Sequence, residues 1–380
     1  MKQILYIFLL GLSCLALSCK TDGEQKKAVT RSGDPVEIKY ASGLKIEEFE
    51  GFKIVTVEEP WPGAEKSYRY LLSESHAKLP EDLEYDQKID IPVQKVVVTS
   101  TTHIPALELL NEENTLVGFP GLDYISSEKT RKRIAQGDIQ ELGKNEALNT
   151  EILLDLKPHV VIGFSIDGSN KSLKTIQKSG IPVVFNGDWT ESSPLGKAEW
   201  IKFFGAFFGK IDRANAIFEQ VEKDYLDARS LAQKAENIPS VLAGAMWKDQ
   251  WYLPAGSSWQ ASFIKDANAN YLFADSEATG SLSLSIESVL AKASTADFWV
   301  GPAQFTTYEE MEHASPHYTK FEAFQNRNIY TFSSVKGETG GVVFYELAPN
   351  RPDLVLKDLI SIFHPELLPD YETTFYKPLE

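Results

Sequence analysis

The residue types that support covalent or metal chemistry are sparse in this chain. Both cysteines, Cys14 and Cys19, lie near the N-terminus, so residues 20–380 contain no thiol for a disulfide, a nucleophile or a metal site. The six histidines are scattered, at His76, His103, His159, His313, His317 and His364. His313 and His317 are four residues apart, but Pro316 breaks the helix that would align them. The sequence therefore predicts no metal centre.

The sequence patterns of common hydrolases are also missing. The chain has no HExxH zinc motif, no GxSxG elbow and no phosphate loop, and the pair Gly340-Gly341 is isolated. We therefore expect a protein that is not an enzyme. A receptor for a zinc or manganese ion and a secreted hydrolase stay open as alternatives, although no residue pattern favours either.

Aromatic side chains are the second group of residues that could bind a ligand. The stretch from Trp247 to Tyr252 holds three aromatic residues in what reads as a turn between strands. Such a rim suits a large planar ligand through stacking, although Trp251 and Trp259 could equally cover a core. Loops that leave the carboxyl ends of strands bind ligands in open α/β sheets. Those loops supply the candidate ligand-binding residues: Thr102, His103, Tyr124, Phe164, Trp247, Trp251, Tyr252, Trp259, Tyr345 and Arg351.

One short phrase occurs twice, and it indicates the elements that position these residues. The two copies, 148–163 and 284–301, place Glu151 and Glu287 136 residues apart (287 − 151). Each copy reads as a short helix with a polar cap and a Glu in its first turn, followed by a buried strand that ends in Gly. A chain that repeats one αβ unit is expected to form two related lobes with a cleft between them.

The remaining pattern predicts an α/β protein with two Rossmann-like lobes, mainly parallel sheets and one long rigid helix that joins them. Strands are expected at 36–40, 52–58 and 67–72, and a polar loop at 73–92. Strands and helices then alternate from residue 95 to residue 185, and again from residue 240 to a closing helix at 352–363, with a helix at 318–324 among them. The amphipathic stretch 211–236 predicts the joining helix. We therefore divide the chain into a first lobe at 35–210, with a β-rich elaboration at 35–92, the helix at 211–236 and a second lobe at 237–380.

Composition limits the partners. A formal net charge of −16 argues against nucleic acid, whose phosphates would repel an acidic surface. Residues 1–19 have a basic start, an apolar run and the ending Ala16-Leu17-Ser18-Cys19, which resembles the bacterial lipoprotein signal with Cys19 as the acylated residue. Cys14 is a weaker alternative, because it interrupts the apolar run. Residues 20–34 read as a flexible tether. We therefore expect a lipid-anchored protein of the bacterial cell envelope that faces the periplasm, or is exposed at the cell surface.

Taken together, the motifs resemble the substrate-binding proteins of ABC transporters for iron complexes and cobalamin. The resemblance covers roughly residues 93–365 and rests on 96–102 with 105–110, 149–162, 180–184, 284–290 and 324–330. At His159 the chain departs from the Asp that the family usually has. The resemblance implies a monomer that carries a ferric siderophore, haem or cobalamin, needs no cofactor, and presents Glu151 and Glu287 to an ABC permease dimer. It also matches Tyr124 with a ligand-contacting aromatic of cobalamin binders.

Overall fold

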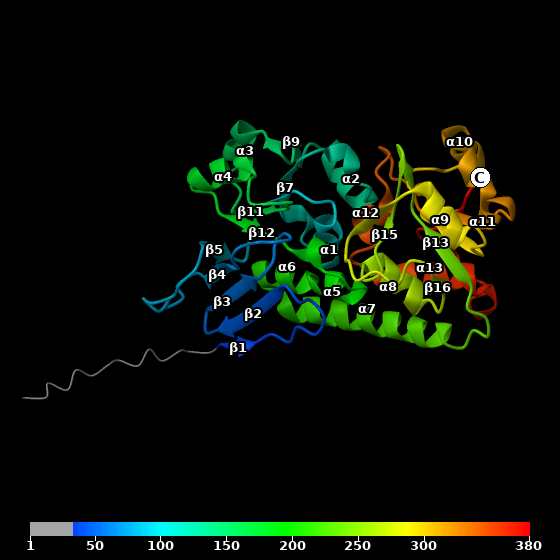
Figure 1. Ribbon diagram of the computed structural model, residues 1–380. Coiled ribbons are helices and arrows are strands. Elements are labelled where there is room, and N and C mark those ends of the chain that lie inside the picture. The colour runs from blue at the N-terminus through cyan, green and yellow to red at the C-terminus, as the bar shows by residue number, and fades with distance from the viewer. Residues whose placement is uncertain (1–32) are drawn as a thin grey trace, which may run out of the picture. The chain divides into compact units, whose positions relative to one another are not determined.

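The computed structural model describes residues 33–380. The predicted signal segment, Cys19 and nearly all of the predicted tether lie outside the described residues. Within Asp34–Glu380, which forms one compact unit, two five-stranded sheets form the centres of two lobes, and a third five-stranded sheet adjoins the first lobe (Figure 1). The prediction of a two-lobed α/β protein is confirmed.

The sheet of the first lobe is fully parallel. Its order is β12-β11-β6-β7-β8, with strands β6 (Val96–Val98), β7 (Leu116–Phe119), β8 (Gln140–Glu141), β11 (Val160–Gly163) and β12 (Val183–Phe185). The connecting helices are α1 (His103–Leu109), α2 (Glu128–Ala135), α3 (Thr150–Leu156) and α4 (Lys171–Lys178), and a small hairpin is made by β9 (Gly143–Lys144) and β10 (Ala147–Leu148). β6 and β11 are buried throughout, which explains their unbroken apolar sequence.

The sheet of the second lobe has the order β16-β13-β18-β19-β20 and is parallel except for its last strand. Its strands are β13 (Ser240–Ala243), β16 (Asn270–Tyr271), β18 (Phe298–Val300), β19 (Ile329–Thr331) and β20 (Lys377–Pro378). A smaller antiparallel sheet consists of β14 (Ala245–Trp247), β15 (Gln250–Pro254) and β17 (Ser281–Leu284). The helices are α8 (Trp259–Asp266), α9 (Ile286–Ala293), α10 (Tyr308–Ala314), α11 (Glu322–Gln325), α12 (Val343–Leu347) and α13 (Pro352–Phe363). The helix predicted at 318–324 is instead a 3-10 turn at Pro316–Lys320 followed by α11, because Phe321 has extended backbone angles.

The elaboration of the first lobe is a mixed sheet in the order β1-β2-β3-β4-β5. Its strands are β1 (Asp34–Pro35), β2 (Leu44–Phe49), β3 (Phe52–Val57), β4 (Tyr68–Glu74) and β5 (Gln87–Ile91). The prediction of a loop throughout 73–92 is wrong, because β5 pairs in parallel with β4. Ile89 and Ile91 are buried between exposed neighbours, a period of two too short to stand out from the sequence.

The prediction of a strand at 36–40 is also wrong, and buried carboxylates explain why. Glu199 accepts the backbone N–H groups of Lys39, Tyr40 and Ala41 at 2.6–3.0 Å. Glu191 likewise accepts the N–H groups of residues 42 and 43. Because these donors are used by two side chains, they are not free for a sheet ladder.

The joining helix α7 (Ile211–Ala232) contributes to two cores. Its first half buries Ala214, Phe218 and Val221 with the first lobe, including α6 (Ile201–Phe207). Its second half buries Tyr225, Ala228 and Ala232 with the second lobe. α5 (Pro194–Glu199) precedes these helices. The helix ends four residues before the predicted residue 236, and its 22 residues extend ~33 Å at 1.5 Å per residue.

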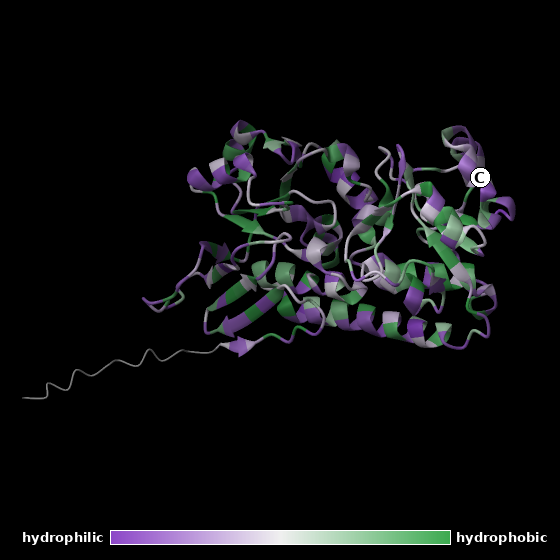
Figure 2. Ribbon diagram, viewed as in Figure 1, coloured by the Kyte–Doolittle hydropathy of each residue, from purple (hydrophilic) through white to green (hydrophobic). Residues whose placement is uncertain are grey.

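Hydropathy follows the same division. In Figure 2 the central strands of both lobes are hydrophobic, whereas α7 alternates between hydrophobic and hydrophilic residues along its length. This is the pattern of buried parallel strands and of a helix packed on one side. Within residues 33–380, no helix combines the length and apolar character needed to cross a membrane.

Candidate functional site

The strand order identifies one point in each lobe where loops separate and leave a crevice. In the first lobe the order reverses between β6 and β11, and in the second between β13 and β18. Open α/β sheets bind ligands at such points, beyond the carboxyl ends of the strands. The second-lobe point coincides with a cavity of about 370 Å³, which the ends of β13 and β18 line with Ala243 and Val300.

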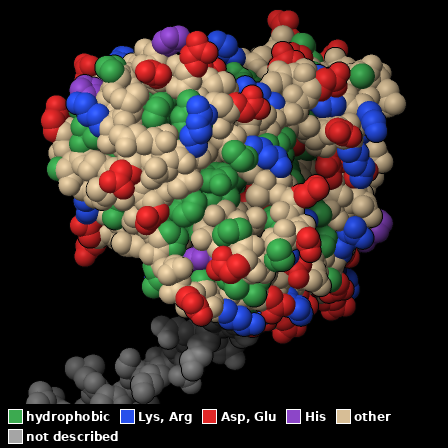
Figure 3. All heavy atoms as spheres, turned by 90° about the vertical axis from the view of Figure 1, so that its right-hand side faces the viewer, with side chains coloured by type: hydrophobic (Ala, Val, Ile, Leu, Met, Phe, Trp, Pro, Cys, Tyr) green, Lys and Arg blue, Asp and Glu red, His purple; other side chains and the backbone are tan. Residues whose placement is uncertain are grey.

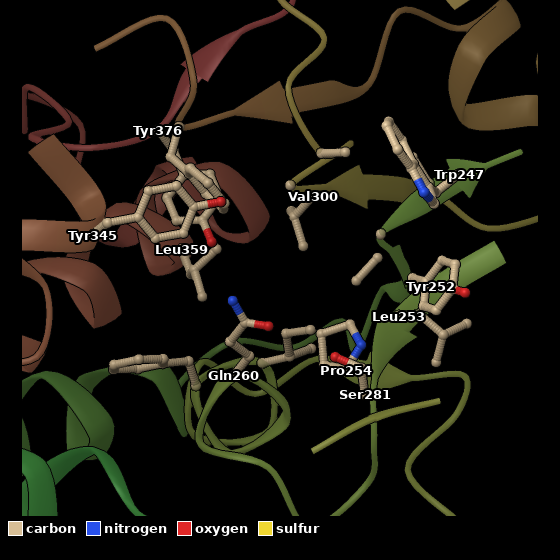
Figure 4. A pocket seen from close by; sticks show the side chains of 18 of the residues that line it. Trp247, Tyr252, Leu253, Pro254, Gln260, Ser281, Val300, Tyr345, Leu359 and Tyr376 are labelled. Carbon is tan, nitrogen blue, oxygen red and sulfur yellow. The ribbon is translucent and has the colours of Figure 1, made fainter. Parts of the chain in front are cut away.

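Aromatic side chains surround this cavity, which we call the second-lobe pocket. Figure 4 shows Trp247 and Tyr252 on one side of it and Tyr345 and Tyr376 on the other, with the amide of Gln260 below them. Trp247 is 69% exposed, Tyr252 44% and Tyr345 48%, so their rings have free surface for a ligand. Three of the predicted ligand-binding residues, Trp247, Tyr252 and Tyr345, therefore line one pocket at a strand end.

No charged side chain lines the second-lobe pocket. Its polar groups are the Gln260 amide, the Ser281 hydroxyl, the Trp247 indole N–H and the tyrosine hydroxyls. Arg351, a predicted ligand contact, instead binds Asp353 through two hydrogen bonds of 2.9 and 2.8 Å. That fork and the fully buried Asp353 carboxylate raise the pKa of Arg351. The guanidinium therefore binds at the start of α13, and Arg351 does not line the second-lobe pocket.

Trp251 requires a correction. Strand alternation in β15 turns Trp251 and Leu253 inward and leaves Tyr252 outside. The Trp251 ring is fully buried, lies 5.1 Å from the Trp299 ring and donates its indole N–H to the Ala243 carbonyl. Trp251 is therefore a core residue with no surface for a ligand.

His103 requires a second correction. It begins α1, is fully buried and lies 5.3 Å from the Phe204 ring. Burial lowers its pKa to about 4, against a smaller opposing effect of Asp188, so the imidazole is neutral at pH 7. Because His103 lies in the first turn of α1 (His103–Leu109), its side chain is buried and does not reach the loop surface that the prediction assumed.

The other first-lobe candidates lie outside the second-lobe pocket. Thr102 is half-buried and donates to Asp188 at 3.0 Å, and Phe164 packs edge-on against Trp189 at 5.5 Å. Tyr124 is 71% exposed.

Trp259, from α8 of the second lobe, packs on Phe263 and Phe344, so it supports the pocket wall rather than lining it.

Sequence reasoning missed several lining residues. Gln260 adjoins the predicted Trp259, and the two could have been considered together at the start of α8. Phe332 follows a strand end, which is a signal of the same kind. Tyr376 comes thirteen residues after α13 (376 − 363), in a stretch without periodicity, and no sequence signal marks it.

The repeated αβ unit is present in both lobes. Asn149 and Ser285 cap α3 and α9 by accepting the N–H groups of Ile152 and Ser288, and Glu151 and Glu287 occupy the exposed first turns. The backbone N–H of Glu287 and the Ser285 hydroxyl lower the pKa of the Glu287 carboxyl. Both helices lie in Figure 1 away from α7.

Two other kinds of site, a metal site and a basic surface patch, were considered beside the second-lobe pocket. Within residues 33–380, no three His, Cys, Asp or Glu side chains gather as a metal site would require. On the face shown in Figure 3, Lys and Arg side chains are interspersed with Asp and Glu and make no continuous basic patch.

Comparison with family models identifies one family. A family model described as periplasmic binding protein matches residues 96–335, which begins at β6 and leaves out the sheet β1–β5. An uncharacterised lipoprotein of Methanocaldococcus jannaschii is 28% identical over 297 residues, or 76% of this chain and 69% of that protein.

Among solved structures, a possible iron-binding periplasmic protein from Staphylococcus epidermidis has a TM-score of 0.57 and 18% identity, covering 72% of this chain and 99% of that one. A periplasmic haem-binding protein of Vibrio cholerae has a TM-score of 0.54 and 18% identity, covering 69% and 99%. A vitamin B12 binding protein of Vibrio cholerae has a TM-score of 0.51 and 13% identity, covering 74% and 99%. These structures share the fold described above.

Proposed function

Because the chain belongs to the family of periplasmic binding proteins, we propose that it is the substrate-binding component of an ABC importer for an iron complex or a corrinoid. The observation that carries this proposal is the aromatic, uncharged second-lobe pocket at the strand-order reversal. A ligand with a broad apolar face stacks on Trp247, Tyr252 and Tyr345 and meets the Gln260 amide at its edge. The protein's role is capture and delivery, not catalysis.

The cavity volume supports partial insertion of the ligand. Ligand sites generally have volumes of about 300–1,000 Å³, and about 370 Å³ accommodates one face of a macrocycle rather than all of it. Haem, a corrinoid or a weakly charged chelate would leave its other face directed at the first lobe. Proteins with the same fold carry names that state binding of iron, haem or vitamin B12.

Two other ligand classes have less support. A free zinc or manganese ion needs His and carboxylate ligands, and the second-lobe pocket has none. A strongly anionic siderophore needs cations at the pocket, but Arg351 is paired with Asp353. Lys197 does not line the pocket either, and its ammonium group donates to two backbone carbonyls at 3.0 Å.

The proposal includes delivery and location. Glu151 and Glu287 would contact basic pockets of the permease, because exposed carboxylates on two lobes fix orientation and speed encounter. Acylation at Cys19 would hold the protein in the cell envelope, and the relative from Methanocaldococcus jannaschii carries the name of a lipoprotein.

Tryptophan fluorescence titration tests the ligand class. Haemin, cyanocobalamin, a neutral ferric hydroxamate and an anionic ferric catecholate are each added to the wild-type protein, and zinc and manganese are tested by thermal shift. We expect saturable quenching by one or more of the first three probes and no shift with the ions. Binding of the catecholate alone, or a shift with an ion alone, would contradict the proposed ligand class.

A further inference from the structure

A segment of the second lobe reaches across to the first lobe beside the second-lobe pocket. We call residues 335–350 the clasp: a hairpin loop closed by the hydrogen bonds of Gly337 to Gly341 and of Val343 to Val335, followed by α12. Thr339 donates to the Asp123 carbonyl at 2.8 Å, and Asn350 donates to the Thr102 carbonyl at 2.8 Å. The clasp therefore connects the lobes independently of α7.

Two glycines let the clasp pack directly on the backbone of the first lobe. A Cβ atom on Gly337 would lie 2.6 Å from Cα of Ser126, and one on Gly341 would collide with the Tyr124 carbonyl. No side chain fits at either position without displacing the main chain. The two backbones thus meet where Tyr124 to Ser126 lead into α2.

Glu346 makes two of the hydrogen bonds that join the clasp to the first lobe. Its two carboxylate oxygens accept the N–H groups of Ser126 and Ser127 at 2.6 and 2.9 Å, and the side chain is 3% exposed. Ser127 is the N-cap of α2, so the carboxylate holds the start of a first-lobe helix. Removing it would leave two buried or half-buried donors without their acceptor.

The three consecutive residues Phe344, Tyr345 and Glu346 point to three different places. Phe344 stacks on Phe332 in the second-lobe core, with ring centroids 4.2 Å apart. Tyr345 lines the second-lobe pocket, and Glu346 binds the first lobe. Steps of about 100° around a helix produce this division.

We propose that Glu346 is a positioning residue, which couples the ligand pocket to the first lobe by fixing α12 and hence the Tyr345 ring. This inference rests on the proposed function, because it assigns a role to Tyr345 in holding the ligand. In the closed clasp, Glu346 is bonded to Ser126 and Ser127, and Tyr345 stays in place opposite Trp247. In an opened clasp these bonds are broken, so α12 is free to move and that wall of the pocket is lost.

The burial of Glu346 gives the coupling a pH dependence. Burial raises the pKa of Glu346 from the ordinary 4.5 to about 7; the N–H groups of Ser126 and Ser127 oppose this effect and the Glu108 carboxylate on α1 adds to it. Other titratable groups lie on α1 and α2. His103 on α1 is buried and neutral. On α2, Arg131 donates to the Leu122 carbonyl and Lys129 pairs with Glu113.

The sign of the pH effect follows from proton binding. Between pH 4.5 and about 7 the closed clasp keeps a proton on Glu346 that an opened, solvated carboxyl releases. Raising the pH through this window therefore favours opening. Above about pH 7 both forms are ionised, and the dependence levels off.

Hydrogen–deuterium exchange of the full chain tests the clasp without any ligand. In Glu346→Ala, the peptide spanning residues 121–130 should exchange at least about tenfold faster than in the wild type. The control Glu312→Ala, an exposed helical Glu in the second lobe, should leave the peptide unchanged. Gly341→Ala should reproduce the faster exchange, and it provides the test if Glu346→Ala fails to fold. Unchanged exchange in the folded variant would overturn the clasp.

Two further readouts separate positioning from a merely structural role. Protection of this peptide, corrected for the intrinsic rate, should fall at least about tenfold between pH 5.5 and pH 8 in the wild type but not in Glu346→Gln. With haemin or cyanocobalamin as probe, Glu346→Ala and Tyr345→Ala should weaken binding to a similar extent. If exchange responds but Glu346→Ala binds the probe like the wild type, the coupling is wrong; if the wild type binds no probe, the ligand assignment fails instead.

Discussion

Trp247 and Trp251 stand four residues apart in the sequence and have opposite environments in the fold. Both were candidate ligand-binding residues, and a core position was left open for Trp251, because aromatic content does not reveal the side to which a side chain points. The hairpin of β14 and β15 decides this, since its alternation buries Trp251 and exposes Trp247. When strand register decides whether a side chain is buried or exposed, composition and spacing alone therefore do not predict its role.

The two tryptophans make a matched pair for a stability measurement. Trp251→Ala should reduce the free energy of unfolding by about 3–5 kcal/mol, because it leaves a cavity beside Trp299. Trp247→Ala should change it by less than about 0.5 kcal/mol, because the ring is mostly exposed. Urea denaturation followed by circular dichroism gives both values. Equal losses for the two variants would contradict the assignment of Trp251 to the core and Trp247 to the pocket.

At the scale of elements, the sequence predicted best where the periodicity was long or repeated. The 3.6-residue pattern from Ile211 onward marks α7, and the duplicated phrase marks α3 with β11 and α9 with β18. It failed where side chains replaced a sheet ladder, as Glu199 does for residues 39–41. It also gave no sign of the clasp, whose contacts join residues more than 200 positions apart.

A helix that contributes to two cores should be sensitive to breaks at its exposed positions. Glu219→Pro, on the solvent face of α7, removes a backbone hydrogen bond and should cost about 3 kcal/mol or more of unfolding free energy. Glu219→Ala keeps the helix and should be neutral or slightly stabilising. Chemical denaturation compares the two variants, and a proline variant as stable as the alanine variant would show that an intact α7 is not required.

At the scale of the whole described unit, α7 and the clasp both join the lobes. Two connections restrict relative motion more than one. The first turns of α3 and α9, which lie in different lobes, should consequently keep a nearly constant separation (Figure 1). Such a constraint suits recognition by a permease dimer at two points.

Charge reversal tests this two-point recognition. The double variant Glu151→Lys, Glu287→Lys should lower ligand uptake by cells at least about tenfold, because like charges would then meet at the permease. Its ligand affinity in fluorescence titration should not change, since neither residue lines the second-lobe pocket. The control Glu309→Lys, Glu322→Lys reverses two other exposed first-turn carboxylates and should transport normally. A loss of ligand binding in the test variant would contradict the docking role.

A hydrogen-exchange footprint of the ligand on the wild-type protein tests whether the second-lobe pocket is the binding site. Haemin and cyanocobalamin are added in turn, and exchange is compared with the free protein across residues 33–380. A probe that binds should slow exchange in peptides covering residues 243–254 and 300–305, where the second-lobe pocket lies. Binding that protects other segments and leaves these two unchanged would contradict the assignment of the ligand to this pocket.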